Sequence, residues 1–139
     1  MARILVAGDQ LVVRLAWWEQ AAARRSGVRV PLTAVRRVTV ESDWWRALRG
    51  TQQRGITVPG AVCLGARGHQ AGEDFVAVRP GRPVVCVELR ASAPFRLLAV
   101  SSRSAAEAEA TARRLRGAAP EIDTSTPWRQ PLPVPGESE

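Results

Sequence analysis

The alternation of apolar and polar residues over positions 28–41 predicts the strands around which the rest of the fold is arranged. Two valines flank an arginine at its start, which is the period of two expected of a strand that buries one face. Pro31 cannot donate a ladder hydrogen bond, so the strand is expected to stop and turn there. The alternation resumes at 38–40. The stretch therefore predicts two strands joined by a compact corner, with Arg36 and Arg37 beside it.

The chain before this stretch predicts a hairpin and a short helix. Arg3–Ala7 and Gln10–Leu15 have strand-like patterns, and Gly8-Asp9 between them suits a two-residue turn with positive φ. Residues 17–25, WWEQAAARR, are good helix formers and poor strand formers. Gly27 is placed to end that helix, although a continuation of the preceding strand is the alternative.

The chain after this stretch predicts one helical turn and then a loop. Ser42 or Asp43 is a suitable cap for a turn over 42–50, and Gly50 is suited to close it. Thr51–Gly60 has turn residues and little periodicity, which predicts a loop long enough to line a cleft.

The second half of the chain predicts strands followed by a capped helix. The strands are expected at 61–66, 75–78, 84–89 and 95–100. Pro80-Gly81 has the signature of a type II turn. Ser104 and Glu107 form the S-x-x-E capping box that opens a helix over 104–116.

Together these elements predict one domain over 1–117, followed by a flexible Pro-rich acidic tail over 118–139. The expected fold is mainly β (α+β). We expect a partly open antiparallel barrel or roll of about seven strands, closed by the C-terminal helix, with a short extra helix near 17–25.

This organisation resembles that of the bacterial pleckstrin-homology-like (PH-like) proteins. The segments that carry the resemblance are Val28–Val40, the strands 75–78, 84–89 and 95–100, and the helix 104–116. The resemblance implies two nearly orthogonal sheets with the last helix closing one end. It implies little about activity, because this fold is mostly a scaffold. Phosphoinositide-binding members have a basic first loop, whereas the corresponding loop here is Gly8-Asp9, without a basic residue.

Composition adds charge to this picture. The chain of 139 residues has a formal net charge of +7, and all twenty of its basic residues are arginine. The tail has four acidic residues against one arginine, so the remaining 117 residues carry +10. Arginines spread over every segment are typical of a solvated surface, but a basic body also attracts acidic partners. No apolar run is long enough for a signal peptide or a membrane span, which predicts a cytoplasmic location.

The residues with chemical potential do not form a specific catalytic motif. His69, Glu73 and Asp74 are the one plausible acid-base grouping. We expect them to form an exposed cluster in or near a loop rather than a catalytic site. Cys63 and Cys86 lie in apolar runs and are expected to be buried free thiols. A single histidine and no paired cysteines predict no metal site and no cofactor.

The tryptophans are the more informative signal, with five Trp against two Phe and no Tyr. Trp17-Trp18 and Trp44-Trp45 each place two large rings on adjacent residues, so one ring of each pair is expected to be exposed. The candidate binding residues are these tryptophans and the arginines near them: Trp17, Trp18, Arg24, Arg25, Arg36, Arg37, Trp44, Trp45 and Arg46.

Three functions follow from these observations. The first is a non-catalytic PH-like module that binds a protein partner or a second copy through Trp and Arg. The second is a small-molecule or lipid-headgroup binder, or an enzyme, with a pocket near the 51–60 loop and His69. The third and weakest is nucleic-acid binding by the basic body, for which the chain has no recognition motif. Peripheral membrane contact has no sequence support, and the sequence favours the first function.

Overall fold

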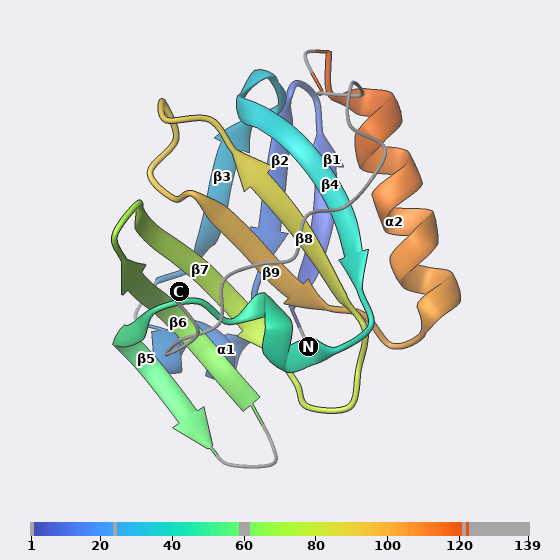
Figure 1. Ribbon diagram of the computed structural model, residues 1–139. Helices are drawn as coiled ribbons and strands as arrows, with labels where there is room; N and C mark the ends of the chain where they lie inside the picture. Colours follow the sequence, from blue (N-terminus) through green and yellow to red (C-terminus); the bar gives the residue numbers. More distant parts are fainter. Residues whose placement is uncertain (1, 24, 59–61, 121, 123–139) are drawn as a thin grey trace.

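The computed structural model describes residues 2–23, 25–58, 62–120 and 122, which form two β-sheets with a helix along their side (Figure 1). The strands are β1 (Arg3–Ala7), β2 (Gln10–Arg14), β3 (Gly27–Pro31), β4 (Val35–Glu41), β5 (Thr51–Val58), β6 (Val62–His69), β7 (Gly72–Val78), β8 (Val84–Leu89) and β9 (Leu97–Ser101). The helical elements are α1 (Trp17–Ala23), α2 (Ala105–Ala118) and the single 3₁₀ turns η1 (Leu32–Ala34) and η2 (Trp44–Ala47).

The strands are ordered β1-β2-β3 in one sheet and β4-β8-β9-β7-β6-β5 in the other. The predicted mainly β fold with a C-terminal helix is therefore confirmed. The arrangement is consistent with a PH-like roll, although the sheets do not close into a barrel.

The corner predicted after Pro31 transfers the chain from one sheet to the other. β3 ends at Pro31, η1 forms the corner, and β4 begins in the six-stranded sheet. Leu32 and Ala34 are buried, and they hold this corner against the core. A β-bulge between Val35 and Arg37 bends the start of β4.

The predicted hairpin and first helix are both present. Ala7 pairs with Gln10 across the two-residue turn, as the sequence indicates. α1 ends at Ala23, however, and the predicted role of Gly27 as its terminator is wrong. Gly27 instead opens β3 and pairs with Arg14 of β2, because strand pairing takes this residue into the sheet.

The prediction of a loop over 51–60 is wrong, because Thr51–Val58 is the edge strand β5, paired along its length with β6. A β-bulge between Gln52 and Arg54 shifts the register. The bulge interrupts the two-residue period, which explains why the sequence shows no alternation there. Residues 59–60 lie outside the described residues.

The order of the last three strands departs from a simple succession of hairpins. β9 lies between β7 and β8, parallel to the first and antiparallel to the second. The predicted type II turn explains the gap, because such turns splay the flanking strands. Gly81 has φ of 82°, and the Arg82 amide donates to the Arg79 carbonyl at 3.3 Å. The turn therefore leaves room for β9.

The six-stranded sheet is buried on both faces at its centre. One face packs against the three-stranded sheet, α1 and α2, and it includes Phe75, Val85 and Leu98. The other face lies under η2 and includes Val76 and Cys86. Burial on both faces explains why β8 and β9 have nearly continuous apolar sequences.

α2 has the predicted cap and the predicted core-facing stripe of Ala108, Ala112 and Leu115. The Glu107 amide donates to Ser104 Oγ at 3.1 Å, which confirms the capping box. The helix contacts β1 and β4, which are edge strands of the two sheets. It therefore covers the side of the molecule where the two sheets come together (Figure 1). The packed chain continues past residue 117, because Ala119 is buried in the same core.

Candidate functional site

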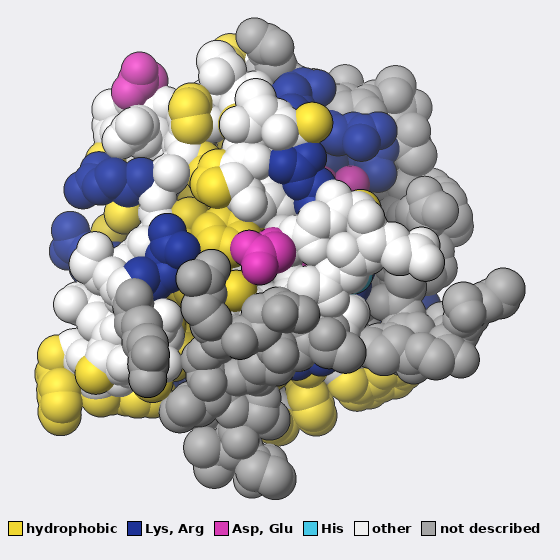
Figure 2. Space-filling model, turned by 90° about the vertical axis from the view of Figure 1, so that its left-hand side faces the viewer, with side chains coloured by type: hydrophobic (Ala, Val, Ile, Leu, Met, Phe, Trp, Pro, Cys, Tyr) yellow, Lys and Arg dark blue, Asp and Glu magenta, His cyan; other side chains and the backbone are white. Residues whose placement is uncertain are grey.

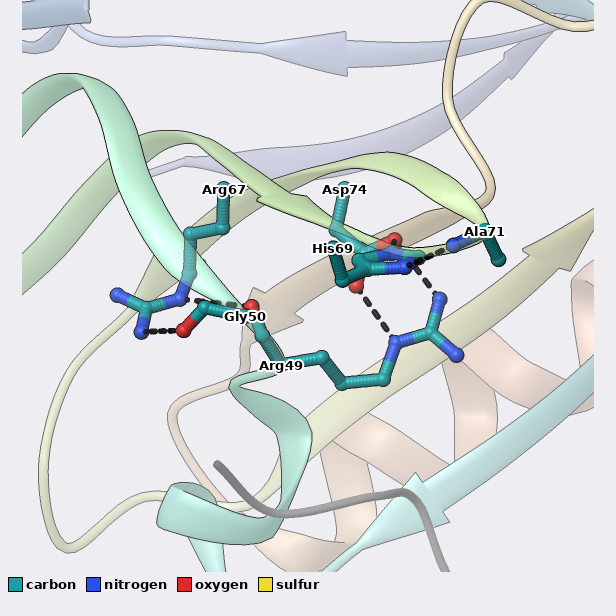
Figure 3. Close-up of polar contacts among 6 residues, drawn as sticks. All are labelled: Arg49, Gly50, Arg67, His69, Ala71 and Asp74. Carbon is teal, nitrogen blue, oxygen red and sulfur yellow. Dashed lines mark hydrogen bonds and ion pairs between the residues drawn. The ribbon is translucent and has the colours of Figure 1, made fainter. Parts of the chain in front are cut away.

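A buried ion pair joins the link between η2 and β5 to β7 (Figure 3). Asp74 is fully buried, and its two carboxylate oxygens accept from the Arg49 guanidinium. Nε donates to Oδ2 at 2.7 Å and Nη2 donates to Oδ1 at 2.8 Å. This is the bidentate geometry that makes arginine–carboxylate pairs strong. The two residues are 25 positions apart in the sequence, so they meet only through the fold.

His69 adds a third contact to the same carboxylate. Its Nε2 lies 2.8 Å from Asp74 Oδ1, and its Nδ1 accepts from the Ala71 amide at 3.1 Å. An acceptor at Nδ1 assigns the hydrogen to Nε2, which therefore donates to the carboxylate. Both ring nitrogens are consequently used within the chain.

Arg67 completes the cluster from β6. Its Nε donates to the Arg49 carbonyl at 3.1 Å and its Nη2 donates to the Gly50 carbonyl at 2.8 Å. Gly50 has φ of 69°, a conformation that side chains with a Cβ rarely adopt. A Cβ at Gly50 would overlap the carbonyl of Gly68. The cluster thus fixes the sharp bend by which the chain passes from η2 into β5.

These contacts correct the predicted acid-base grouping. His69 and Asp74 lie on paired strands rather than in a loop, because β6 extends to His69 and the turn is only two residues long. Asp74 is buried rather than exposed. Among the described residues, the Glu73 side chain takes no part in the hydrogen bonds of this cluster. Both carboxylate oxygens of Asp74 and both ring nitrogens of His69 are hydrogen-bonded within the chain, so the cluster ties the η2–β5 bend to β6 and β7.

The predicted exposure of one ring in each tryptophan pair is observed. Trp17 is 81% exposed and Trp45 is 48% exposed, whereas Trp18 and Trp44 are half-buried against the core. The two pairs do not meet on one surface. α1 packs on the face of the six-stranded sheet that is turned toward the three-stranded sheet, and η2 packs on the opposite face. Trp17 and Trp45 therefore belong to separate surfaces.

The candidate arginines have different surroundings. Arg25 places its guanidinium 5.2 Å from the Phe95 ring, and Arg46 lies 5.9 Å from the Trp45 ring. Arg37 is paired with Glu88 at 3.5 Å, and Arg36 is exposed. Arg24 lies outside the described residues. Figure 2 views the molecule from the left side of Figure 1. On the face that it shows, arginine and apolar side chains lie next to one another.

The other predicted features concern thiols and membrane spans. Cys63 and Cys86 are buried thiols that are not joined in a disulfide, as expected. Within the part of the chain that the structure describes, no three His, Cys, Asp or Glu side chains are grouped to hold a metal ion. Among the same residues, no helix has the length and apolar character needed to cross a membrane.

Sequence reasoning missed the residues that the fold brings together. Arg49 and Arg67 have no local motif, and only the pairing of β6 and β7 with the η2–β5 bend defines their roles. Glu19 is also buried, and its carboxylate accepts from the amides of Ala2 and Ala16. A glutamate in the first turn of a predicted helix is the signal that indicates such a capping role.

A separate cavity of about 240 Å³ lies between β1, the end of β9 and α2, and none of the predicted site residues lines it. The chain matches no protein-family model, no curated protein and no solved structure.

Proposed function

We propose that this chain is a non-catalytic PH-like interaction module that binds a protein partner through exposed tryptophan and arginine side chains. The observation that carries the proposal is the 81% exposure of Trp17. Trp is a large apolar residue that is usually highly buried. Its exposure on a folded domain is typical of a binding surface.

The charges near α1 define the chemistry of the partner. Trp17 shares the outward side of α1 with Gln20 and Ala21, which are also exposed. The acidic residue of the helix, Glu19, is buried and so contributes nothing to that side. Exposed Arg14 and Arg25 flank α1 along the chain. The partner is therefore expected to present an apolar side chain beside carboxylates.

The second element, Trp45 with Arg46, has the same chemistry. The Arg46 guanidinium lies over the Trp45 ring, and its Nε is buried without a hydrogen-bond partner among the described residues. A guanidinium held on an aromatic face is preorganised to bind a carboxylate. Because η2 and α1 cover opposite faces of the sheet, Trp45 is expected to bind a different part of the partner or to contribute less.

Native mass spectrometry of the chain purified gently from its own host tests this proposal. The wild type is expected to carry a second polypeptide, which Trp17→Ala loses and which Gln20→Ala, on the same side of α1, retains. Trp45→Ala measures the share of the second element. Thermal unfolding of Trp17→Ala should be unchanged, because an exposed side chain contributes within about 0.5 kcal/mol.

Two outcomes would overturn the proposal. A homo-oligomer that depends on Trp17 would replace the protein partner with a second copy of the chain. A monomer mass in the wild type, with or without a small-molecule adduct, would remove the protein partner altogether.

A further inference from the structure

We propose that the cavity beside α2 binds a small phosphate-bearing molecule. The cavity lies between the open edge of β1, the end of β9 and α2, with a volume of about 240 Å³. Pockets for drug-sized ligands occupy roughly 300–1,000 Å³. The space therefore suits a phosphate monoester or a diphosphate group rather than a whole nucleotide.

Three arginines from three different segments line this cavity. Arg3 comes from β1, Arg103 from the link between β9 and α2, and Arg114 from α2. None of their guanidinium groups has a hydrogen-bond or ion-pair partner among the described residues. Like charges around one concave space repel one another, and a bound anion removes that repulsion. Guanidinium groups also match the geometry of phosphate oxygens.

The one carboxylate in the lining does not neutralise this charge. Glu107 Oε1 accepts from the Arg103 backbone amide at 2.8 Å, and the Glu107 amide donates to Ser104 Oγ. Glu107 is therefore held in the capping box of α2. Three arginines against one glutamate leave the lining positive. The capped start of α2 is not itself the binding element, and the arginine side chains carry the attraction.

Ser102 supplies an observation that does not depend on surface charge. It is only 6% exposed, it lines the cavity, and its hydroxyl has no hydrogen-bond partner among the described residues. Its backbone is fixed, because the Ser102 amide donates to the Pro83 carbonyl at 2.9 Å. The Ser102 hydroxyl is open to the cavity rather than sealed in the core, and it can donate to a phosphate oxygen there.

α2 presents the rest of the polar lining on one side. Glu107, Thr111 and Arg114 are spaced at i, i+4 and i+7, and all three line the cavity. Arg113 is exposed and next to Arg114, but it is not part of the lining. The helix therefore offers a matched pair of arginines, one at the cavity and one away from it.

The test is calorimetric titration of the full chain with inorganic pyrophosphate at constant, low ionic strength. Arg3→Gln and Arg114→Gln are expected to weaken binding at least about tenfold, because each removes a charge-assisted hydrogen bond. Ser102→Ala should weaken it about three- to tenfold without any change of charge. Arg113→Gln should change it less than about twofold. Circular dichroism verifies the fold of each variant.

Several results would overturn the proposal. Equal weakening by Arg113→Gln and Arg114→Gln would show attraction to the basic surface in general. Unchanged binding in Ser102→Ala would place the anion outside the cavity, and no measurable binding to the wild type would refute the site. Co-sedimentation with phosphatidylcholine vesicles containing phosphatidylserine, without pyrophosphate binding, would assign the charge to a membrane surface instead.

Discussion

Two groups of arginines in this protein have opposite relations to their surroundings. Arg49 and Arg67 are half-buried, and they donate to a buried carboxylate and to backbone carbonyls of the same chain. Arg3, Arg103 and Arg114 surround a cavity, and their guanidinium groups have no such partner among the described residues. The residue type is the same, so the difference lies in whether the fold supplies the acceptor. The first group stabilises the molecule, and the second is available to a ligand.

Removing the partner of the buried carboxylate is expected to have the largest effect. Arg49→Met removes both guanidinium donors from the buried Asp74 carboxylate and leaves it with only His69, which should reduce the free energy of unfolding by about 3–5 kcal/mol. Urea denaturation followed by tryptophan fluorescence measures this loss. Arg103→Met, the same substitution at an exposed position, should change stability by less than about 0.5 kcal/mol.

A second variant isolates the cause of that loss. Asp74→Asn in the Arg49→Met background removes the unpaired charge, and it should recover part of the lost stability. A double variant no more stable than Arg49→Met would contradict the role given to the buried charge. Should Arg49→Met fail to fold, Arg49→Lys is the milder test, because it keeps the charge but loses the bidentate geometry.

The bend held by the cluster should respond to a backbone substitution. Gly50→Ala is expected to cost about 2–3 kcal/mol, because its φ is 69° and a Cβ would overlap the Gly68 carbonyl. Gly81→Ala is the matched control, since Gly81 has φ of 82° but no atom lies within 4 Å of its Cβ position. That control should cost only about 1 kcal/mol. Equal losses in the two unfolding curves would refute the close approach at Gly50.

The contrast between local and distant interactions also explains what the sequence could predict. The capping box of α2, the corner after Pro31 and the Gly8-Asp9 hairpin depend on neighbouring residues, and the structure contains all three. The turn at Pro80-Gly81 leaves room between β7 and β8, but the insertion of β9 into that room depends on which strands pair, and no local pattern encodes that pairing.

The candidate site divides in the same way. The exposure of one ring in each tryptophan pair could be predicted from adjacent large rings, but not that Trp17 and Trp45 are the exposed ones. The pairing of Arg49 with Asp74 could not, because it joins elements 25 positions apart. His69 and Asp74 were recognisable as neighbours, but their burial depends on β6 continuing to His69, through residues rich in glycine and arginine that resemble a loop.

Substitution of Arg14 should stabilise the protein, in contrast to the destabilising substitutions of Arg49 and Gly50. Arg3 and Arg14 are exposed and lie directly opposite each other on β1 and β2, so their side chains share one face of the sheet. Like charges in this position are destabilising. Arg14→Gln is therefore expected to raise the free energy of unfolding by about 0.2–0.5 kcal/mol at low ionic strength.

Salt distinguishes that repulsion from a change in strand propensity. Two exposed charges are largely screened in about 0.5 M sodium chloride, so the gain from Arg14→Gln should nearly disappear in urea titrations at that concentration. A gain that persists at high salt would instead arise from the properties of glutamine in a strand. A loss of stability at low salt would show that these exposed arginines have partners, and would remove the contrast with Arg49.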